Sequence, residues 1–164
     1  VDKDMIARYM LYATAPLVLR DYFPFGSGFA SYGTFSSGVY YSNIYSEYGI
    51  DGIWGMTKSY YSFIADTYYP SLAQFGVVGI CLFFFFWALI VKRAYAHYKK
   101  NGDSKLFSLV LLVVTYLLIE STTDSTLTTH RGFFVLMILG LCLSDLKRKS
   151  KSISHTNNKI ALEQ

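Results

Sequence analysis

The sequence predicts an all-α, polytopic membrane protein, in which a polar external region is followed by about three transmembrane helices. Hydrophobic residues make up 52% of the 164 residues and charged residues only 16%, a balance that suits a membrane protein better than a soluble domain. Residues 71–91 form a run of about 21 uncharged, mostly apolar positions, which is long enough to cross a bilayer. Two shorter apolar runs follow, and a chain of this size cannot bury all three in a soluble core.

The alternation of polar and apolar runs divides the chain into segments. We expect an external region with short helices over 1–70, a transmembrane helix over 71–91, a cytoplasmic basic loop over 92–105, a second transmembrane helix over 106–123, an external link over 124–131, a third transmembrane helix over 132–146 and a basic, disordered cytoplasmic tail over 147–164. The two later apolar runs are short, so each could instead be re-entrant or buried in protein.

The distribution of charge sets the expected topology. Residues 92–105 hold five basic residues and one acidic residue, and 147–151 is also basic. Short loops rich in Lys and Arg face the cytoplasm. Residues 1–70 and 124–131 would then lie together on the external side of the membrane.

The first residues are predicted to form an extramembrane helix. Residues 1–15 carry apolar side chains at helical spacing, with acidic residues at the start, where they suit the helix dipole. Pro16 is expected to end or re-aim this helix, because the residue before a proline avoids the helical region. The chain opens within this helix and without a signal peptide, so we expect the C-terminal portion of a larger polytopic protein or a truncated reading frame.

The external region is rich in turns and tyrosine. Glycines in FPFGSGFASYG permit positive φ and close backbone approach, but the pattern is neither a P-loop nor GxGxxG, so a nucleotide site is not expected. Twelve of the 15 tyrosines fall at or before Tyr69. They fit an interfacial aromatic belt, stacking platforms for sugar rings, or both. The tyrosines concerned are Tyr40, Tyr41, Tyr45, Tyr48, Tyr60, Tyr61, Tyr68 and Tyr69.

Residues near the two ends of the first span predict its contacts and its position in the membrane. Gly76 and Gly79 near its start would permit close helix contact. Trp87 and the Lys92-Arg93 pair are expected to mark the opposite membrane interface.

Three charged residues of the external region are the best candidates for chemistry. Arg8 and Arg20 could bind an anionic group, because a guanidinium pairs with phosphate through two hydrogen bonds. Either could equally be a solvated surface arginine or a headgroup anchor. Asp66, just before the first span, could serve as a general base. It could also be a helix N-cap, with Thr67 and Pro70 following.

The remaining charges are weaker candidates. His130 and Arg131 could add a second cation to the site or simply mark the membrane interface, and Asp21 and Glu47 could orient other groups. The sequence has no Ser-His-Asp ordering, HExxH, paired-cysteine motif or basic-aromatic stripe typical of nucleic-acid binding. We therefore expect no metal site and no nucleic-acid partner.

Several short motifs follow one another in an order that resembles a known arrangement. Arg8 lies in the first helix, Pro24-Phe25-Gly26-Ser27-Gly28 forms a P-x-G-x-G turn, Asp66 precedes the first span, and Gln74-Phe75-Gly76-Val77-Val78-Gly79 opens that span. With the later TTHRGFFVLMILGL, this arrangement resembles the O-antigen ligase and polymerase family, the Wzy/WaaL-like membrane enzymes of bacterial surface polysaccharides. The resemblance spans residues 5–145. It departs from many ligases, which have a histidine at or beside the position of Asp66, and it lacks the family's upstream spans.

The resemblance implies a GT-C-like helical membrane fold and glycosyl transfer without a cofactor. The donor would be an undecaprenyl-diphosphate-linked oligosaccharide, and the acceptor another sugar. Arg8 would stabilise the diphosphate leaving group, and Asp66 would remove or orient the proton of the acceptor hydroxyl. The implied substrate-binding residues are Arg20, Asp21, Tyr22, Gly26, Gly28, Tyr41, Glu47 and Arg131.

The resemblance also implies a bacterial inner-membrane location and a set of partners. These are the lipid-linked oligosaccharide, the lipid bilayer, and chain-length regulator and flippase proteins. Within the family a polymerase is favoured over a ligase, because an aspartate stands where many ligases have histidine and the loop is rich in tyrosine. A flippase or other transporter is an alternative, although the spans carry almost no ionisable residues. An inactive membrane fragment is another.

Overall fold

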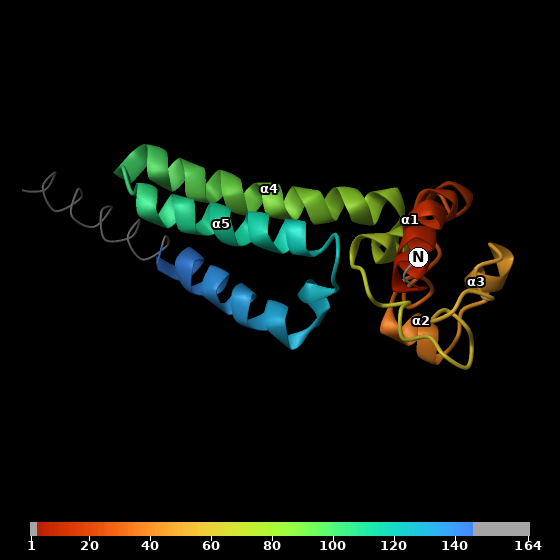
Figure 1. Cartoon of the computed structure of the whole chain (residues 1–164). Coiled ribbons are helices and arrows are strands. Elements are labelled where there is room, and N and C mark those ends of the chain that lie inside the picture. Colours follow the sequence, from red (N-terminus) through yellow and green to blue (C-terminus); the bar gives the residue numbers. More distant parts are fainter. Residues whose placement is uncertain (1–2, 146–164) are drawn as a thin grey trace, which may run out of the picture.

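The chain is all-α over the residues that its structure describes. The computed structural model describes residues 3–145 (Figure 1). Within that range there is no β-strand, only an isolated bridge between Thr57 and Tyr60. The elements are α1 (Lys3–Asp21), α2 (Phe35–Val39), α3 (Ile44–Glu47), the 3-10 helix η1 (Tyr69–Phe75), α4 (Gly76–Asn101), α5 (Ser104–Glu120), the 3-10 helix η2 (Thr126–Thr128) and a helix over 130–145.

The elements form two regions, which we name the loop unit (residues 3–75) and the helical unit (residues 76–145). In Figure 1 the helical unit is an elongated set of helices, and the loop unit lies at one end of it, with α1 running across the direction of α4. The loop unit has its own core of α1 residues, two tyrosines and loop side chains. That core consists of Ala7, Leu11, Ala15, Val18, Tyr32, Ile44, Tyr45, Ile50, Met56, Ile64 and Ala73.

The predicted break in the first helix is wrong, because α1 continues through Pro16 to Asp21. Pro16 is exposed, whereas Leu11 and Val18 on the same helix are fully buried. A proline inside a helix removes one backbone hydrogen bond. Burial of the apolar stripe on both sides of Pro16 offsets that loss, so packing overrides the local preference.

One member of the predicted aromatic surface proves to be part of the core. Tyr45 is fully buried, and its hydroxyl accepts from Gly33 N at 2.9 Å and lies 2.6 Å from Ser37 Oγ. Tyr32, which packs against it, is also fully buried. Hydrophobic periodicity could not predict the burial of these two tyrosines, because the segment is irregular. A buried tyrosine also needs a hydrogen-bond partner, and only the folded loop supplies one here.

The helical unit begins with a helix longer than predicted. Residues 71–75 belong to η1, and α4 runs on to Asn101, so most of the expected loop over 92–105 is helix. Only Gly102 and Asp103 separate α4 from α5. Gly102 takes the left-handed conformation that ends helices readily, and the Asp103 carboxylate accepts from Leu106 N at 3.3 Å to begin the next one.

The later boundaries shift as well. The second apolar helix covers Ser104–Glu120 rather than 106–123, and the residues after it form a turn. The third covers 130–145 of the described chain. The expected disordered tail over 147–164 lies outside the described residues.

The helical unit is held together by apolar contacts. Trp87, Ile90 and Ala94 of α4 pack with residues of α5, and Leu139 and Cys142 join them from the helix over 130–145. Trp87 is only 4% exposed, so it does not mark a membrane interface as predicted. It faces the neighbouring helices instead.

One helical stretch in the described chain is long and apolar enough to cross a membrane. It is the 33-residue stretch Tyr69–Asn101, and only 22% of its most apolar window is buried within the protein. A core helix of a soluble protein would be mostly buried. The adjoining α5 is shorter, at 17 residues.

Candidate functional site

The structure brings Arg8 and Asp66 together, although 58 residues separate them along the chain. Arg8 Nε donates to Asp66 Oδ2 at 2.6 Å, and Arg8 Nη2 lies 2.5 Å from the same oxygen. The side chains are 35% and 29% exposed. Each therefore remains accessible, and Nη1 of Arg8 and Oδ1 of Asp66 take no part in the contact.

This ion pair replaces both alternative interpretations of the two residues. Arg8 is not a free surface arginine, because its charge is matched by Asp66. Asp66 is not the N-cap of the following helix, because η1 is capped by Tyr68 and has no side-chain cap hydrogen bond. Asp66 instead lies in the irregular segment before η1, and η1 packs against α1, which carries Arg8.

Hydrogen bonds from the segment after α5 reach the surroundings of the pair. Ser125 Oγ donates to the carbonyl of Ala65, the residue before Asp66, at 2.5 Å. Tyr12, one turn beyond Arg8 on α1, donates to the carbonyl of Thr122 at 2.7 Å. The pair therefore lies where α1, the end of the loop region and the segment after α5 meet, next to the start of the long helix.

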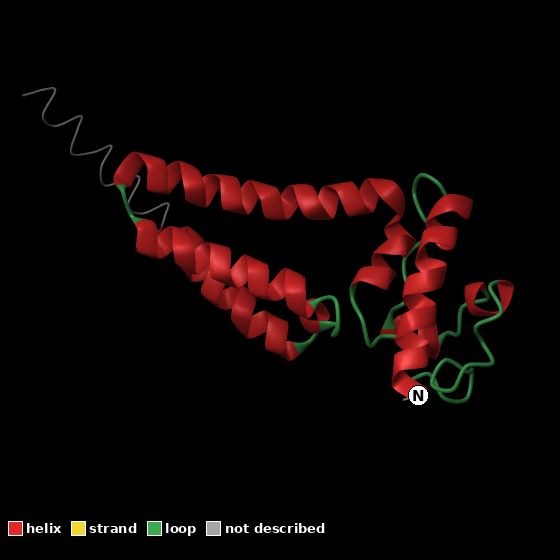
Figure 2. Ribbon diagram, turned by 45° about the horizontal axis from the view of Figure 1, so that its top comes forward, coloured by secondary structure: helices red, strands yellow, loops and turns green. Residues whose placement is uncertain are grey.

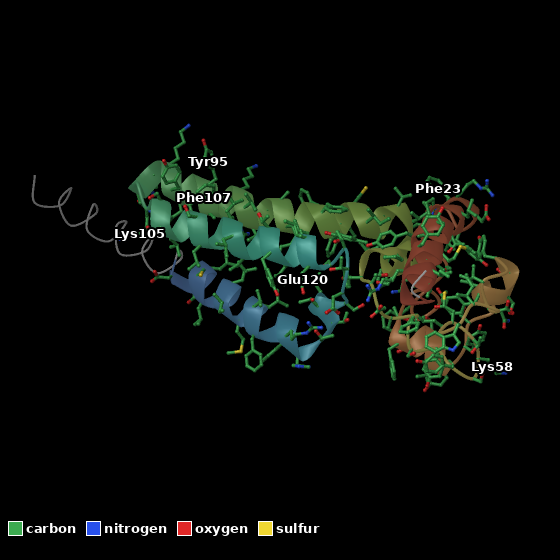
Figure 3. All side chains as sticks on the ribbon, in the orientation of Figure 1. Phe23, Lys58, Tyr95, Lys105, Phe107 and Glu120 are labelled. Carbon is green, nitrogen blue, oxygen red and sulfur yellow. The ribbon has the colours of Figure 1, made fainter. Side chains whose placement is uncertain are left out.

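A third connection at this junction comes from η1. Tyr69 donates its hydroxyl hydrogen bond to the carbonyl of Leu118 at 2.6 Å. Burial raises the pKa of Tyr12, so this phenol stays protonated and remains a donor in neutral solution. Figure 3 shows Glu120 at the end of α5 that lies nearer the loop unit.

Arg131 carries a second ion pair. Its Nη2 bonds Asp124 Oδ2, and its side chain is 57% exposed. Arg131 lies in the first turn of the helix over 130–145, close in sequence to Ser125, which contacts the loop unit. His130 is exposed beside it. Arg131 thus belongs to the segment that meets the Arg8–Asp66 pair, without contacting the pair itself.

The other predicted polar residues gather at the opposite end of α1. Arg20 Nε donates to Asp21 Oδ1 at 2.8 Å, and Tyr48 donates to Asp21 Oδ2 at 2.9 Å. Tyr22 donates to Glu47 Oε2 at 3.0 Å. Arg20 lies twelve positions after Arg8 on one helix, a rise of about 18 Å. The predicted site residues therefore form two separate groups.

Electrostatic shifts in the second group follow from these hydrogen bonds. The bonds from Arg20 and then Tyr48 hold the pKa of Asp21 below its ordinary value. Burial, followed by the bond to Asp21, raises the pKa of Tyr48 to about 12. The bond to Glu47 raises the pKa of Tyr22. The group is an exposed network of neutral phenols and charged side chains, which is a surface able to hydrogen-bond polar ligands such as sugars.

Glycines of the predicted site lie where the loop unit contacts the helical unit. Gly26 and Gly76 face each other so closely that a Cβ on Gly26 would lie 2.3 Å from Gly76 N. Gly28 N donates to the carbonyl of Gln74 at 3.0 Å. The close contact predicted for Gly76 therefore exists, but its partner is the loop after α1 and not another helix. Figure 2 shows this loop next to the beginning of α4.

Tyr41 also has a role inside the loop unit. It is half-buried, and its hydroxyl donates to the carbonyl of Met56 at 2.7 Å. Burial raises its pKa.

Tyr12 and Ser125 were not among the predicted site residues, and Tyr48 was predicted only as part of the aromatic surface. Tyr12 had a detectable signal, because it lies one helical turn from Arg8. Tyr48 and Ser125 had none, since they contact partners 27 and 60 residues away. Among the described residues, no three His, Cys, Asp or Glu side chains lie close enough to bind one metal ion.

No model of a protein family, no curated protein and no solved structure matches this chain.

Proposed function

We propose that this protein polymerises undecaprenyl-diphosphate-linked oligosaccharide repeat units into O-antigen or another surface polysaccharide, at the external face of the bacterial inner membrane. The observation that carries the proposal is the accessible Arg8–Asp66 pair at the base of the loop unit. The two residues expected to handle the leaving group and the acceptor hydroxyl are held side by side. They also lie close to the membrane-length helix along which a lipid-linked donor would approach.

Arg8 and Asp66 would have separate roles in the reaction. A diphosphate oxygen would bind the guanidinium of Arg8, where Nη1 is not used by Asp66, and the positive charge would stabilise the negative charge that builds as the glycosidic bond to phosphate breaks. The acceptor hydroxyl would bind Asp66, which takes its proton as the new glycosidic bond forms. The network of Arg20, Asp21, Tyr22 and Glu47 would bind the glycan farther from the reacting atoms.

The proposed topology has three spans with the loop unit outside. In this arrangement α4, α5 and the helix over 130–145 would all cross the membrane, and the α4–α5 turn would face the cytoplasm. Figure 3 shows Tyr95, Lys105 and Phe107 at the end of the helical unit away from the loop unit. Basic residues at that end agree with the positive-inside tendency of membrane proteins.

The test uses the complete gene in a strain that lacks its own copy. Arg8→Ala and Asp66→Ala are introduced separately, and the surface-glycan ladder is compared on a gel with the amount of protein in the membrane fraction. We expect both variants to reach the membrane and to lose the long chains while single repeat units remain attached. Loss of all attached glycan, with accumulation of lipid-linked polymer, would indicate a ligase instead.

Two control variants sharpen this test. Lys58→Ala removes an exposed charge at the far end of the loop unit and should leave the ladder normal (Figure 3). The exchange Arg8→Asp with Asp66→Arg can restore the ion pair but places each group on the wrong substrate, so it should remain inactive. A normal ladder from stable Arg8→Ala and Asp66→Ala proteins would reject catalysis by this pair and favour a flippase, another transporter or an inactive fragment.

A further inference from the structure

The loop that joins α1 to the rest of the loop unit exposes an unusual set of apolar side chains. Phe23, Phe25 and Phe29 are 70%, 75% and 82% exposed. Large aromatic side chains are strongly apolar and seldom gather on a surface that faces only water. The sequence around them is uncharged as well, since no charged residue occurs between Asp21 and Glu47.

Backbone contacts fix the depth of this loop relative to α4. The carbonyl of Pro24 accepts from Val78 N at 3.4 Å, and Gly28 N donates to the carbonyl of Gln74 at 3.0 Å. The close approach of Gly26 to Gly76 holds the loop at the same place beside the start of α4. The loop therefore lies at the level of the first turn of the helix that is long enough to cross a membrane.

The exposed phenylalanines continue an apolar face of the helix itself. The ring of Phe29 lies 6.3 Å from that of Phe75, which immediately precedes α4 and is also exposed. Val78 and Leu82, on the first two turns of α4, are exposed as well. If α4 crosses a bilayer, the apolar surface that begins on its lipid-facing side extends without interruption onto the loop.

We propose that residues Phe23–Phe29 form an interfacial anchor, in which Phe25 and Phe29 insert into the boundary between headgroups and acyl chains of the external leaflet. Aromatic and aliphatic side chains presented without charge are the surface that this boundary binds. The anchor fixes α1 across the membrane surface, since α1 ends two residues before Phe23. This inference does not depend on the proposed glycosyl transfer and requires only that α4 crosses the membrane.

The opposite end of the loop unit provides the internal reference. Figure 3 shows Lys58 at the end of the molecule away from the helical unit. Ser59, beside it, is exposed and follows a charged residue. A probe at position 59 should therefore report water, while probes at positions 25 and 29 report lipid.

The experiment measures depth with spin labels. The two native cysteines are replaced by Cys81→Ser and Cys142→Ala, and Phe25→Cys, Phe29→Cys and Ser59→Cys are introduced singly. Each labelled protein is reconstituted in vesicles of phosphatidylethanolamine and phosphatidylglycerol. Collisions with oxygen, which concentrates in lipid, are compared with collisions with a water-soluble nickel chelate. We expect the oxygen-to-nickel collision ratio to be several-fold higher at positions 25 and 29 than at position 59.

Each other outcome has a defined meaning. Frequent collisions with nickel at positions 25 and 29 would place the loop in water and overturn the anchor. Infrequent collisions with both reagents would mean that another polypeptide covers the loop, and would equally overturn the anchor.

A second measurement uses tryptophan fluorescence and needs no cysteine. The two native tryptophans are replaced by Trp54→Phe and Trp87→Phe, and Phe29→Trp is introduced. This protein should lose most of its fluorescence in vesicles of brominated lipid. Unchanged fluorescence would contradict the proposal.

Discussion

The loop unit and the helical unit are stabilised in opposite ways. The core of the loop unit includes buried polar groups that are hydrogen-bonded, such as Tyr32, whose hydroxyl donates to the carbonyl of Leu11 at 2.7 Å. In the helical unit the buried Trp87 Nε1 and both ring nitrogens of His97 have no hydrogen-bond partner among the described residues. Within the described chain, Thr67 Oγ1 is the one such atom in the loop unit. The interior of the loop unit thus relies more on polar partners, and that of the helical unit more on apolar packing.

The outer surfaces differ in the same sense. In α4, Leu82, Phe85 and Phe86 point outward and are more than half exposed, so the helical unit exposes apolar surface along its length. The surface of the loop unit carries ion pairs and hydrogen-bonded phenols. It also exposes apolar side chains, namely Phe35 and those of the phenylalanine loop (Phe23–Phe29). The helical unit therefore exposes more apolar surface than the hydrogen-bonded parts of the loop unit, and its α4 lies in the stretch that is long and apolar enough to cross a membrane.

The strongest test of the loop unit's core is Tyr45→Ala. Loss of a fully buried aromatic side chain should reduce the free energy of unfolding by about 3–5 kcal/mol. Tyr45→Phe is the matched control and should cost about 1–3 kcal/mol, because only the hydroxyl that serves Gly33 N and Ser37 is lost. Limited proteolysis across a urea series measures both. Equal effects of the two variants would show that packing of the ring matters little.

A charge on the outward face of α4 tests its apolar surroundings. Phe85 is 60% exposed near the middle of α4, so Phe85→Lys should cost about 2.5–3.5 kcal/mol of membrane insertion. The measurement is the fraction of protein that resists alkaline extraction from membranes. Ser59→Lys, in the loop unit, should have no effect. An unchanged extraction-resistant fraction for Phe85→Lys would contradict a lipid-facing Phe85 and remove the basis for a membrane-crossing α4.

The joint between the units can be tested with two alanines. Gly26 and Gly28 both have positive φ, at 80° and 98°, so alanine at either position should cost about 1–3 kcal/mol of backbone strain. A Cβ at Gly26 would also collide with Gly76 N and the carbonyl of Gln74, whereas a Cβ at Gly28 meets no atom within 4 Å. Gly26→Ala should therefore lower the thermal midpoint further than Gly28→Ala. Equal midpoints would mean that the loop can move away from α4.

The smallest expected effect is a titration in the surface network. The pKa of Tyr48 is raised to about 12, above the ordinary value of about 10. The folded state therefore favours the neutral phenol, and the stability it adds is present below about pH 10 and is lost as the pH rises toward about 12. Burial also raises the pKa of Tyr32 and Tyr45, so the late rise in tyrosinate absorbance should lose the contribution of one phenol in Tyr48→Phe, and part of it should move to lower pH in Asp21→Asn. A late rise unmoved by Asp21→Asn would exclude the hydrogen bond as a contributor.

Much of the secondary structure was predictable, but its boundaries were not. The periodicity of residues 1–15 indicated a helix, and the apolar run at 71–91 indicated a membrane-length one. The continuation of α1 through Pro16 depends on burial of Leu11 and Val18 against other segments, which no local preference records. Burial also accounts for the extension of α4 to Asn101. Ala94 and His97 are buried, and Ala94 belongs to the core shared with the neighbouring helices.

The candidate site was predictable as residues and not as an arrangement. Arg8 and Asp66 were recognisable as charged groups beside apolar segments, and Arg20, Asp21 and Glu47 as possible ligands of a polar substrate. Their division into two groups depends on the continuous helix α1, which places Arg8 and Arg20 twelve positions apart. Trp87 and Tyr45 were assigned to surfaces but are buried, because aromatic side chains suit both environments.

Periodicity, run length and residue type are local properties, so the helical character of the chain, its long apolar helix and its candidate charged residues can be read from the sequence. The contacts of Arg8 with Asp66 and of Gly26 with Gly76, and the position of the phenylalanine loop level with the start of α4, depend on the fold. These contacts join residues roughly fifty positions apart. They form because the loop unit folds around a shared core, and no local pattern encodes which distant partners that core brings together.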